Sequence, residues 1–278
     1  MAGRFEGKVA FITGVARGQG RAHAVRLASE GANIIGIDLC DQIKTVAYPM
    51  STLADLDETT KLVEGLGSRM IARPADVRDR ESLQTVLDEG VEAFGRLDFV
   101  IANAGIMPMF GPEANSMQCW QDCLDVLLTG VLHTVEATYP RLVEQGEGGS
   151  IIVTSSMAAM QPQMRTSDAH TLGVLGYSAA KAALLNLMQN YASLLAYHRV
   201  RVNALVPTGV NTPMIQNEMV ETRFATANPE DIATLINAIP VNAVEPEDIA
   251  NAAAWLCSDE SRFYTGSAMR IDAGASLR

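Results

Sequence analysis

A tyrosine and a lysine stand four residues apart in the segment GYSAAKAALL, residues 176–185. Side chains at positions i and i+4 of a helix share a face, so Tyr177 and Lys181 would be neighbours if this segment is helical. A phenol has an unperturbed pKa of about 10, and a nearby cation lowers that pKa because it favours the phenolate. The pair is therefore a candidate acid/base centre, although one turn of an ordinary surface helix gives the same pattern.

A glycine-rich segment, TGVARGQG at residues 13–20, directly follows an apolar run. Gly14 suits a tight turn, while Gly18 and Gly20 would let a pyrophosphate and the following helix approach closely. The start of that helix would offer free N–H groups to phosphates. Glycines also serve ordinary turns, so the motif gains its weight from its place between a strand and a helix. In that place it predicts a dinucleotide site.

A carboxylate, Asp38, ends the next apolar run, 24 positions after Gly14. There it can bind both ribose hydroxyls of a dinucleotide and would repel a 2′-phosphate. No basic residue follows directly, because Leu39 and Cys40 come next. The sequence therefore favours NAD over NADP as the cofactor. The competing interpretation is a plain loop carboxylate at the end of a strand.

Apolar runs that suit buried strands alternate with segments of helical spacing along the chain. The expected strands cover 8–13, 33–38, 69–73, 98–103, 150–155, 201–207 and 267–272, and the expected helices 20–30, 57–66, 79–94, 116–144, 176–197 and 247–257. This alternation predicts an α/β fold, a Rossmann-type, doubly wound, seven-stranded parallel sheet with helices on both faces. No linker or repeat interrupts it, so we expect a single domain over residues 1–278. Ligands of such sheets bind at the carboxyl ends of the strands, where the candidate residues fall.

The bulk properties exclude several classes of function. The chain has 278 residues, 48% of them hydrophobic, and a formal net charge of −11. This charge argues against nucleic-acid and membrane partners. The N-terminal segment is too short and polar for a signal peptide, and no run approaches the roughly 18 apolar residues of a membrane span, so we expect a cytoplasmic protein. Cys119 and Cys123 lack His or carboxylate partners at ligand spacing and are interpreted as buried thiols, so no metal site is proposed.

Together the motifs resemble those of the short-chain dehydrogenase/reductase family, of the classical type, and they extend over essentially the whole chain. The matching elements are TGxxxGxG at 13–20, DV at 76–77, NAG at 103–105, Ser156, YxxxK at 177–181 and a proline/threonine stretch at 207–212. The resemblance implies an NAD-dependent enzyme that interconverts an alcohol and a ketone. Tyr177 would be the general acid/base, Lys181 would lower the pKa of Tyr177 and bind the nicotinamide ribose, and Ser156 would hydrogen-bond the substrate oxygen.

The resemblance also implies a set of cofactor-binding residues. Asp76 and Val77 would hold the adenine, and Val210 and Thr212 the carboxamide and diphosphate. The full set is Gly14, Arg17, Gly18, Gln19, Gly20, Asp38, Leu39, Asp76, Val77, Asn103, Ala104, Gly105, Tyr177, Lys181, Pro207, Val210 and Thr212. Family members commonly form tetramers, so a homotetramer is expected.

Two features depart from the family pattern. Ser156 and Tyr177 are 21 residues apart, a longer gap than usual, so extra residues, roughly QPQMRTSDAHTL, lie beside the substrate. The stretch DVLLTGV places Leu127 where the family usually has an asparagine that supports a water in a proton relay. Leu127 cannot hydrogen-bond, which puts this relay in doubt.

A narrower resemblance comes from about 15 extra residues near 41–55, within the segment DLCDQIKTVAYPMSTLADLDETTKLVEGLG. They resemble the carveol-dehydrogenase-like, mycofactocin-coupled branch of the family, in which such an insertion is thought to cover the cofactor. This implies tightly held NAD and a redox-cofactor electron acceptor. The alternatives are a conventional dehydrogenase with freely exchanging NAD(H), a loop for subunit contacts, and a non-catalytic NAD or ligand sensor.

The family resemblance also implies that the segment 212–242 forms a substrate lid. It carries Met214, Ile215, Met219 and Phe224, and Met107, Met109, Met157, Met160 and Met164 lie in other loops near the site. Flexible apolar side chains at a pocket suit a terpenoid- or steroid-like alcohol or ketone. The competing interpretation is that most of these methionines belong to the core.

Overall fold

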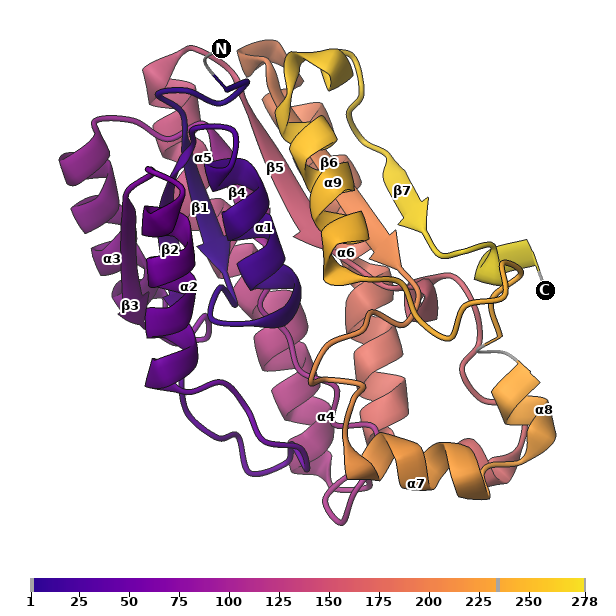
Figure 1. Cartoon of the computed structure of the whole chain (residues 1–278). Coiled ribbons are helices and arrows are strands. Elements are labelled where there is room, and N and C mark those ends of the chain that lie inside the picture. The colour runs from indigo at the N-terminus through magenta and orange to yellow at the C-terminus, as the bar shows by residue number, and fades with distance from the viewer. Residues whose placement is uncertain (1–2, 234–235, 278) are drawn as a thin grey trace.

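One sheet of seven parallel strands organises the computed structural model, which describes residues 3–233 and 236–277. The strands are β1 (Val9–Thr13), β2 (Asn33–Asp38), β3 (Met70–Pro74), β4 (Phe99–Ala102), β5 (Gly149–Thr154), β6 (Val200–Pro207) and β7 (Ala268–Ile271). Their order is β3-β2-β1-β4-β5-β6-β7, and all neighbours pair in parallel (Figure 1). The predicted Rossmann-type architecture is confirmed. The strand order reverses between β1 and β4, which is where such sheets bind dinucleotides.

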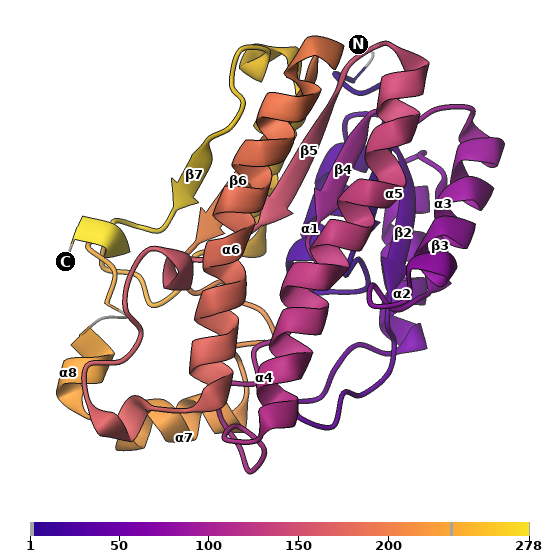
Figure 2. The same cartoon turned by 180° about the vertical axis from the view of Figure 1, so that it is seen from behind.

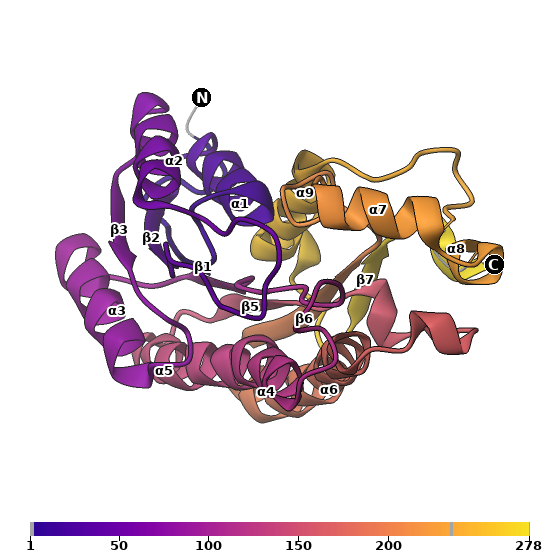
Figure 3. The ribbon, with the colours of Figure 1, turned by 90° about the horizontal axis from the view of Figure 1, so that it is seen from below.

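Helices cover both faces of the sheet. On one face lie α1 (Gly18–Ala28), α2 (Leu53–Gly65) and α9 (Pro246–Cys257), and on the other α3 (Arg80–Phe94), α4 (Met117–Leu124), α5 (Gly130–Gln145) and α6 (Leu172–Leu195) (Figures 2 and 3). Successive residues of a strand point to opposite faces. In β5, Ile151 and Val153 therefore join the core under α4–α6, while Ile152 joins the core under α1 and α9.

Three helices differ from the expected boundaries. α2 begins at Leu53 rather than near residue 57, because Thr52 and Asp55 form a reciprocal capping box. α6 begins at Leu172 rather than 176, since the Thr171 hydroxyl caps it by accepting from the N–H of Val174. The single helix expected over 116–144 contains a π-helical turn, Asp125–Thr129, between α4 and α5.

Two segments cover the carboxyl end of the sheet. The insertion after β2 ends where α2 begins. The expected lid contains two short helices, α7 (Glu218–Thr226) and α8 (Pro229–Ile232), which lie at the bottom of Figure 1. Residues 234 and 235 of this segment are outside the described residues.

No helix of the described chain is long and apolar enough to cross a bilayer. No group of three potential metal ligands occurs in the described residues.

Candidate active site and cofactor groove

The end of β5 holds the predicted catalytic residues through three successive positions. The carbonyl oxygen of Thr154 accepts a hydrogen bond of 2.6 Å from Lys181 Nζ. The hydroxyl of Ser155 donates to the main-chain oxygen of Lys181 at 2.8 Å, which fixes α6 against the strand. Ser156 follows, near enough to Tyr177 for its side chain to lower the pKa of the phenol by hydrogen bonding. Ser156, Tyr177 and Lys181 therefore converge, as the sequence predicted.

The electrostatics of this group differ from the expectation. Burial raises the pKa of Tyr177, the hydrogen bond with Ser156 lowers it, and the thiol of Cys123 raises it. Burial also lowers the pKa of Lys181 to about 8. Lys181 Nζ lies 5.8 Å from the centre of the Tyr177 ring. The net direction for Tyr177 is thus upward, because the loss of water disfavours the phenolate.

The glycine-rich loop lies against two other loops of the sheet edge. Gly14 has φ of +68°, and a Cβ there would stand 2.8 Å from the Cα of Ala104. Gly18 has φ of +57°, and a Cβ there would stand 3.2 Å from Thr212 Cγ2. Gly14 requires glycine for conformation and for space, and the positive φ of Gly18 also favours glycine. No side chain caps α1 at Arg17, so the first N–H groups of this helix are available to an anion.

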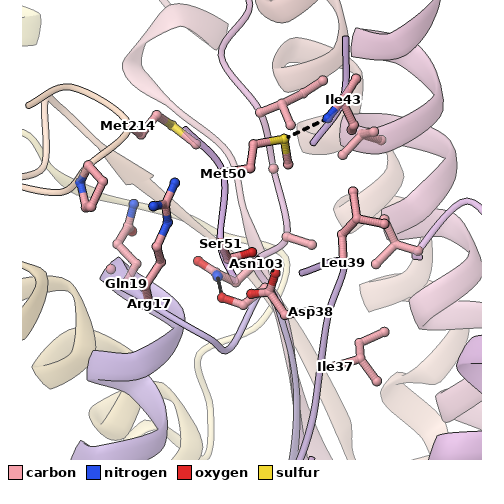
Figure 4. A pocket seen from close by; sticks show the side chains of 18 of the residues that line it. Arg17, Gln19, Ile37, Asp38, Leu39, Ile43, Met50, Ser51, Asn103 and Met214 are labelled. Carbon is pink, nitrogen blue, oxygen red and sulfur yellow. Dashed lines mark hydrogen bonds between the residues drawn. The ribbon is translucent and has the colours of Figure 1, made fainter. Parts of the chain in front are cut away.

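A cavity extends along this edge between the glycine-rich loop, the ends of β2 and β4, and the insertion. Figure 4 shows Arg17 and Gln19 on one side, Leu39 and Ile43 on the other, and Asp38 with Ser51 between them. Twelve of the predicted cofactor residues line it: Gly14, Arg17, Gly18, Gln19, Asp38, Leu39, Asp76, Val77, Asn103, Ala104, Gly105 and Thr212.

The other predicted cofactor residues lie outside the lining of this cavity. Gly20 is buried, and a Cβ there would stand 1.9 Å from the carbonyl oxygen of Gly14, so it allows α1 to pack on the loop. Val210 is buried in the core under α1 and α9, and Pro207 ends β6 beside Ile271. Lys181 adjoins the cavity at its NAG end, where a Cβ on Gly105 would stand 3.8 Å from Lys181 Nζ, and Tyr177 lies one helical turn before Lys181.

The NAG segment is tied to the glycine-rich loop by Asn103. Its side-chain amide donates to the carbonyl oxygens of Thr13 at 3.1 Å and Gly14 at 3.2 Å. The hydroxyl of Thr13 accepts from the N–H of Asn103 at 3.0 Å. Asn103 therefore positions backbone on both sides of the cavity. Asp76, by contrast, pairs with Arg78 at 2.6 Å, which occupies part of its carboxylate.

Asp38 is already held by the protein at both carboxylate oxygens. One oxygen accepts from the N–H of Ala16 at 2.8 Å, and the other accepts from the hydroxyl of Ser51 at 2.5 Å. A carboxylate has further lone pairs, so these bonds still leave acceptor capacity for ribose hydroxyls. They also fix the negative charge in the place where a 2′-phosphate would have to lie.

The sequence singled out the insertion but none of its side chains. Four of them, Ile43, Tyr48, Met50 and Ser51, line the cavity. The hydroxyl of Tyr48 accepts from the N–H of Met107 at 3.1 Å, so the insertion reaches the loop after β4. Nothing in the spacing of Tyr48 or Ser51 indicates these long-range partners. The capping pattern at Thr52, in contrast, is a local signal that could have been read from the sequence, although the expected helix start near residue 57 missed it.

These residues fit a dinucleotide. The glycine cradle has no space for a Cβ at Gly14, free N–H groups lie at the start of α1, and Gln19 Oε1 is buried without a hydrogen-bond partner among the described residues. The carboxylate of Asp38 suits an unphosphorylated ribose.

Comparison with known proteins agrees with this geometry. A family model described as Enoyl-(Acyl carrier protein) reductase matches residues 14–276. The chain belongs to the short-chain dehydrogenase/reductase family. It is 44% identical to (-)-trans-carveol dehydrogenase from Rhodococcus erythropolis, over 99% of both chains.

Two solved structures of this family resemble the fold closely. Carveol dehydrogenase from Mycobacterium avium in complex with NAD superposes with a TM-score of 0.90 at 44% identity, covering 99% of this chain and 100% of that one. A short chain dehydrogenase from Mycobacterium paratuberculosis bound to NAD gives 0.91 at 42% identity, with coverage of 99% and 100%. The predicted similarity to carveol dehydrogenases is therefore confirmed.

Proposed function

We propose that this protein is an NAD-dependent oxidoreductase that interconverts a secondary alcohol and a ketone. The convergence of Ser156, Tyr177 and Lys181 at the end of β5, beside a cavity that fits a dinucleotide, carries this proposal. Bound NAD would supply the hydride acceptor. Ser156 would orient the substrate oxygen, and Tyr177 would take its proton as general base. Lys181 would hold the cofactor ribose and favour the phenolate through its charge.

We further propose that NAD stays bound between turnovers because the insertion clamps the groove. Ser51 binds Asp38, and Arg17 donates to the carbonyl oxygen of Pro49 at 2.5 Å. At the far end, the hydroxyl of Thr45, 3% exposed, donates to Asp122 on α4 at 2.5 Å. A ligand covered by the insertion can leave only after several of these hydrogen bonds break. An external redox cofactor of the mycofactocin type would then regenerate NAD in place.

The substrate is proposed to be apolar, terpenoid- or steroid-like. Met157, which follows Ser156, is 5% exposed. Met214 and Met219 in the lid are half-buried, and Met214 also lines the cofactor cavity. The similarity to carveol dehydrogenases, whose substrate is a terpenoid alcohol, supports the same class.

One experiment distinguishes an enzyme that retains NAD(H) from one that exchanges it and from a non-catalytic sensor. The purified protein is dialysed extensively, denatured, and the released nucleotide is quantified. Stoichiometric NAD(H) after dialysis supports the clamped, acceptor-coupled enzyme, and carveol should then bleach an artificial electron acceptor without added NAD. An empty protein that oxidises carveol only with added NAD is a conventional dehydrogenase. A protein that binds NAD but turns over no alcohol supports the sensor alternative.

Assembly as a homotetramer in the cytoplasm completes the proposal. Leu132 on α5 and Leu194 on α6 are 36% and 60% exposed, which leaves apolar surface for subunit contacts. Light scattering on the purified protein tests the assembly, and a monomer would contradict it.

A further inference from the structure

The β4 loop, residues 106–111, follows the NAG segment and packs against the start of α6. The hydroxyl of Thr171 donates to the carbonyl oxygen of Met109 at 2.9 Å. A Cβ on Gly173 would stand 2.1 Å from the carbonyl oxygen of Pro108, so only glycine lets α6 approach the loop this closely. Because α6 also carries the catalytic tyrosine and lysine, the β4 loop lies beside the catalytic group.

The insertion holds the β4 loop from another side. The hydroxyl of Tyr48, a residue that is 6% exposed, accepts from the N–H of Met107 at 3.1 Å. Further along the loop, a Cβ on Gly111 would stand 2.6 Å from the Cβ of Ala47, and Gly111 has φ of +102°. Gly111 is therefore required for space and for conformation. The insertion thus contacts the β4 loop near both of its ends.

The expected substrate lid reaches the same loop. A Cβ on Gly111 would also stand 3.6 Å from Met219 Cε on α7. In Figure 1 the insertion runs to the lower end of α4, close to the first turn of α7. The β4 loop contributes two methionines of its own, Met107, which is half-buried, and Met109, which is 8% exposed. An apolar loop is therefore enclosed by the insertion, the catalytic helix and the lid.

We propose that the insertion forms part of the substrate site as well as the cofactor cover, because Tyr48 fixes the β4 loop against which the apolar part of the alcohol packs. Tyr48 is then a positioning residue that selects among alcohols, and it takes no part in the transfer of hydride or proton. This inference rests on the proposed function, in which an apolar secondary alcohol binds beside Ser156 and Tyr177. It extends that function by giving the insertion a second ligand.

The selection would follow from the order of the β4 loop. Methionine side chains are flexible and adapt to many ligands, so a loop that carries two of them discriminates only if its backbone is fixed. Fixing a binding loop in advance lowers the entropy cost of binding. The bond between Met107 and the Tyr48 hydroxyl supplies this constraint on the side of the insertion, as Thr171 does on the side of α6. The benefit grows with the apolar surface that the alcohol buries.

Tyr48→Phe tests the proposal, because it removes the hydroxyl and keeps the ring that lines the cofactor cavity. With saturating NAD in all assays, the KM for carveol should rise about threefold to tenfold, the effect of one lost hydrogen bond. The kcat and the NAD content after dialysis should stay as in the unmodified protein. The KM for cyclohexanol, a ring alcohol without the apolar substituents of carveol, should hardly change. Tyr197→Phe is the matched control, since Tyr197 is 93% exposed.

Three results of these assays would overturn the proposal. An unchanged KM for carveol removes Tyr48 from the substrate site. An equal rise in KM for both alcohols means that Tyr48 does not select between them. A rise in KM that is accompanied by loss of NAD from Tyr48→Phe assigns the effect to the cofactor groove.

Hydrogen exchange tests the contact without turnover. In Tyr48→Phe the amides of the β4 loop should exchange about threefold to tenfold faster, whereas Ser51→Ala should leave their exchange unchanged because Ser51 binds Asp38. Equal exchange in Tyr48→Phe and the unmodified protein overturns the role of Tyr48, whether or not an alcohol is turned over. An unmodified protein that turns over neither alcohol, although its β4 loop loses protection in Tyr48→Phe, contradicts the proposed function instead.

Discussion

The cofactor side and the substrate side of the same sheet edge are closed in different ways. On the cofactor side, buried hydroxyls of the insertion bind groups on β2 and α4, and Ser51 and Thr45 are only 8% and 3% exposed. On the substrate side, the catalytic residues are fixed to β5, but the cover above them exposes large apolar side chains, such as Phe224 at 49%. A cover whose hydroxyls are buried against the sheet edge suits a ligand that stays, whereas a cover with exposed apolar side chains suits apolar ligands that exchange.

If the two sides act separately, a substitution can lower turnover without affecting NAD retention. The largest such effect is expected for Tyr177→Phe. Loss of the general base should lower kcat by about 10²- to 10⁴-fold, while the NAD content after dialysis stays unchanged. Tyr191→Phe is the matched control, because Tyr191 lies on the same helix and binds Glu136 away from the site. Alcohol turnover and nucleotide content are measured on both. Full activity in Tyr177→Phe would refute the assignment of the base.

His23 lies away from both covers, on α1, a helix that packs against α9. It is completely buried, neither ring nitrogen has a partner among the described residues, and burial lowers its pKa to about 4 from 6.5. The unfolded chain binds a proton at His23 more tightly than the folded chain does. The folded protein therefore has its full stability above about pH 6.5 and loses stability as the pH falls toward 4. The loss amounts to about 3 kcal/mol.

Chemical denaturation across this pH window measures the effect. His23→Leu should flatten the dependence of the unfolding free energy on pH, and the exposed His198→Gln should leave it as it is. An equally steep profile in His23→Leu would assign the acid sensitivity to other groups.

The strength of the cofactor clamp is tested by Ser51→Ala. The hydrogen bond from Ser51 to the Asp38 carboxylate involves a charge, so its loss should cost about 1.5 kcal/mol and speed NAD release about tenfold. Ser68→Ala is a matched control, since Ser68 is also 8% exposed but binds the carbonyl oxygen of Ala28 elsewhere. Release is followed by trapping freed NAD. Equal rates in the two variants would remove Ser51 from the clamp.

The smallest effect is expected on the substrate side, at Asp231. This lid residue accepts from the hydroxyl of Thr166 at 2.6 Å and from the N–H of Arg165 at 2.8 Å, which joins the lid to the loop after Ser156. Thr166→Val should raise the KM for the alcohol about threefold to tenfold, the effect of one weakened hydrogen bond, with little change in kcat or NAD retention. The exposed Thr222→Val serves as control. Faster NAD release in Thr166→Val would show that the two covers act together.

The fold was predictable because its signals are local and repeated. The central strands are mainly apolar, as in VAFIT of β1 and FVIA of β4, and each strand is followed by a turn or a helix start. The positions of the glycine-rich loop, Asp38 and the Tyr177–Lys181 pair were predictable for the same reason, since each depends on its place after a strand or on one helix face.

The rest depended on contacts between distant segments. The bonds from Ser51 to Asp38 and from Tyr48 to Met107 follow from the path of the insertion, which no spacing rule specifies. The π-helical turn at Leu127 has no marker in the sequence DVLLT. The net rise in the pKa of Tyr177 reflects burial, which outweighs any local effect of a lysine four residues away.

The cover that the insertion forms over the cofactor groove also has a consequence for metabolism. A dehydrogenase that exchanges its nucleotide runs in the direction set by the cell's ratio of NAD to NADH. If the nucleotide stays bound under the insertion, as proposed above, that ratio would no longer act on the reaction. The direction would then be set by the relative concentrations and reduction potentials of the alcohol and its acceptor, so an alcohol could be oxidised even while the dissolved NAD pool is largely reduced.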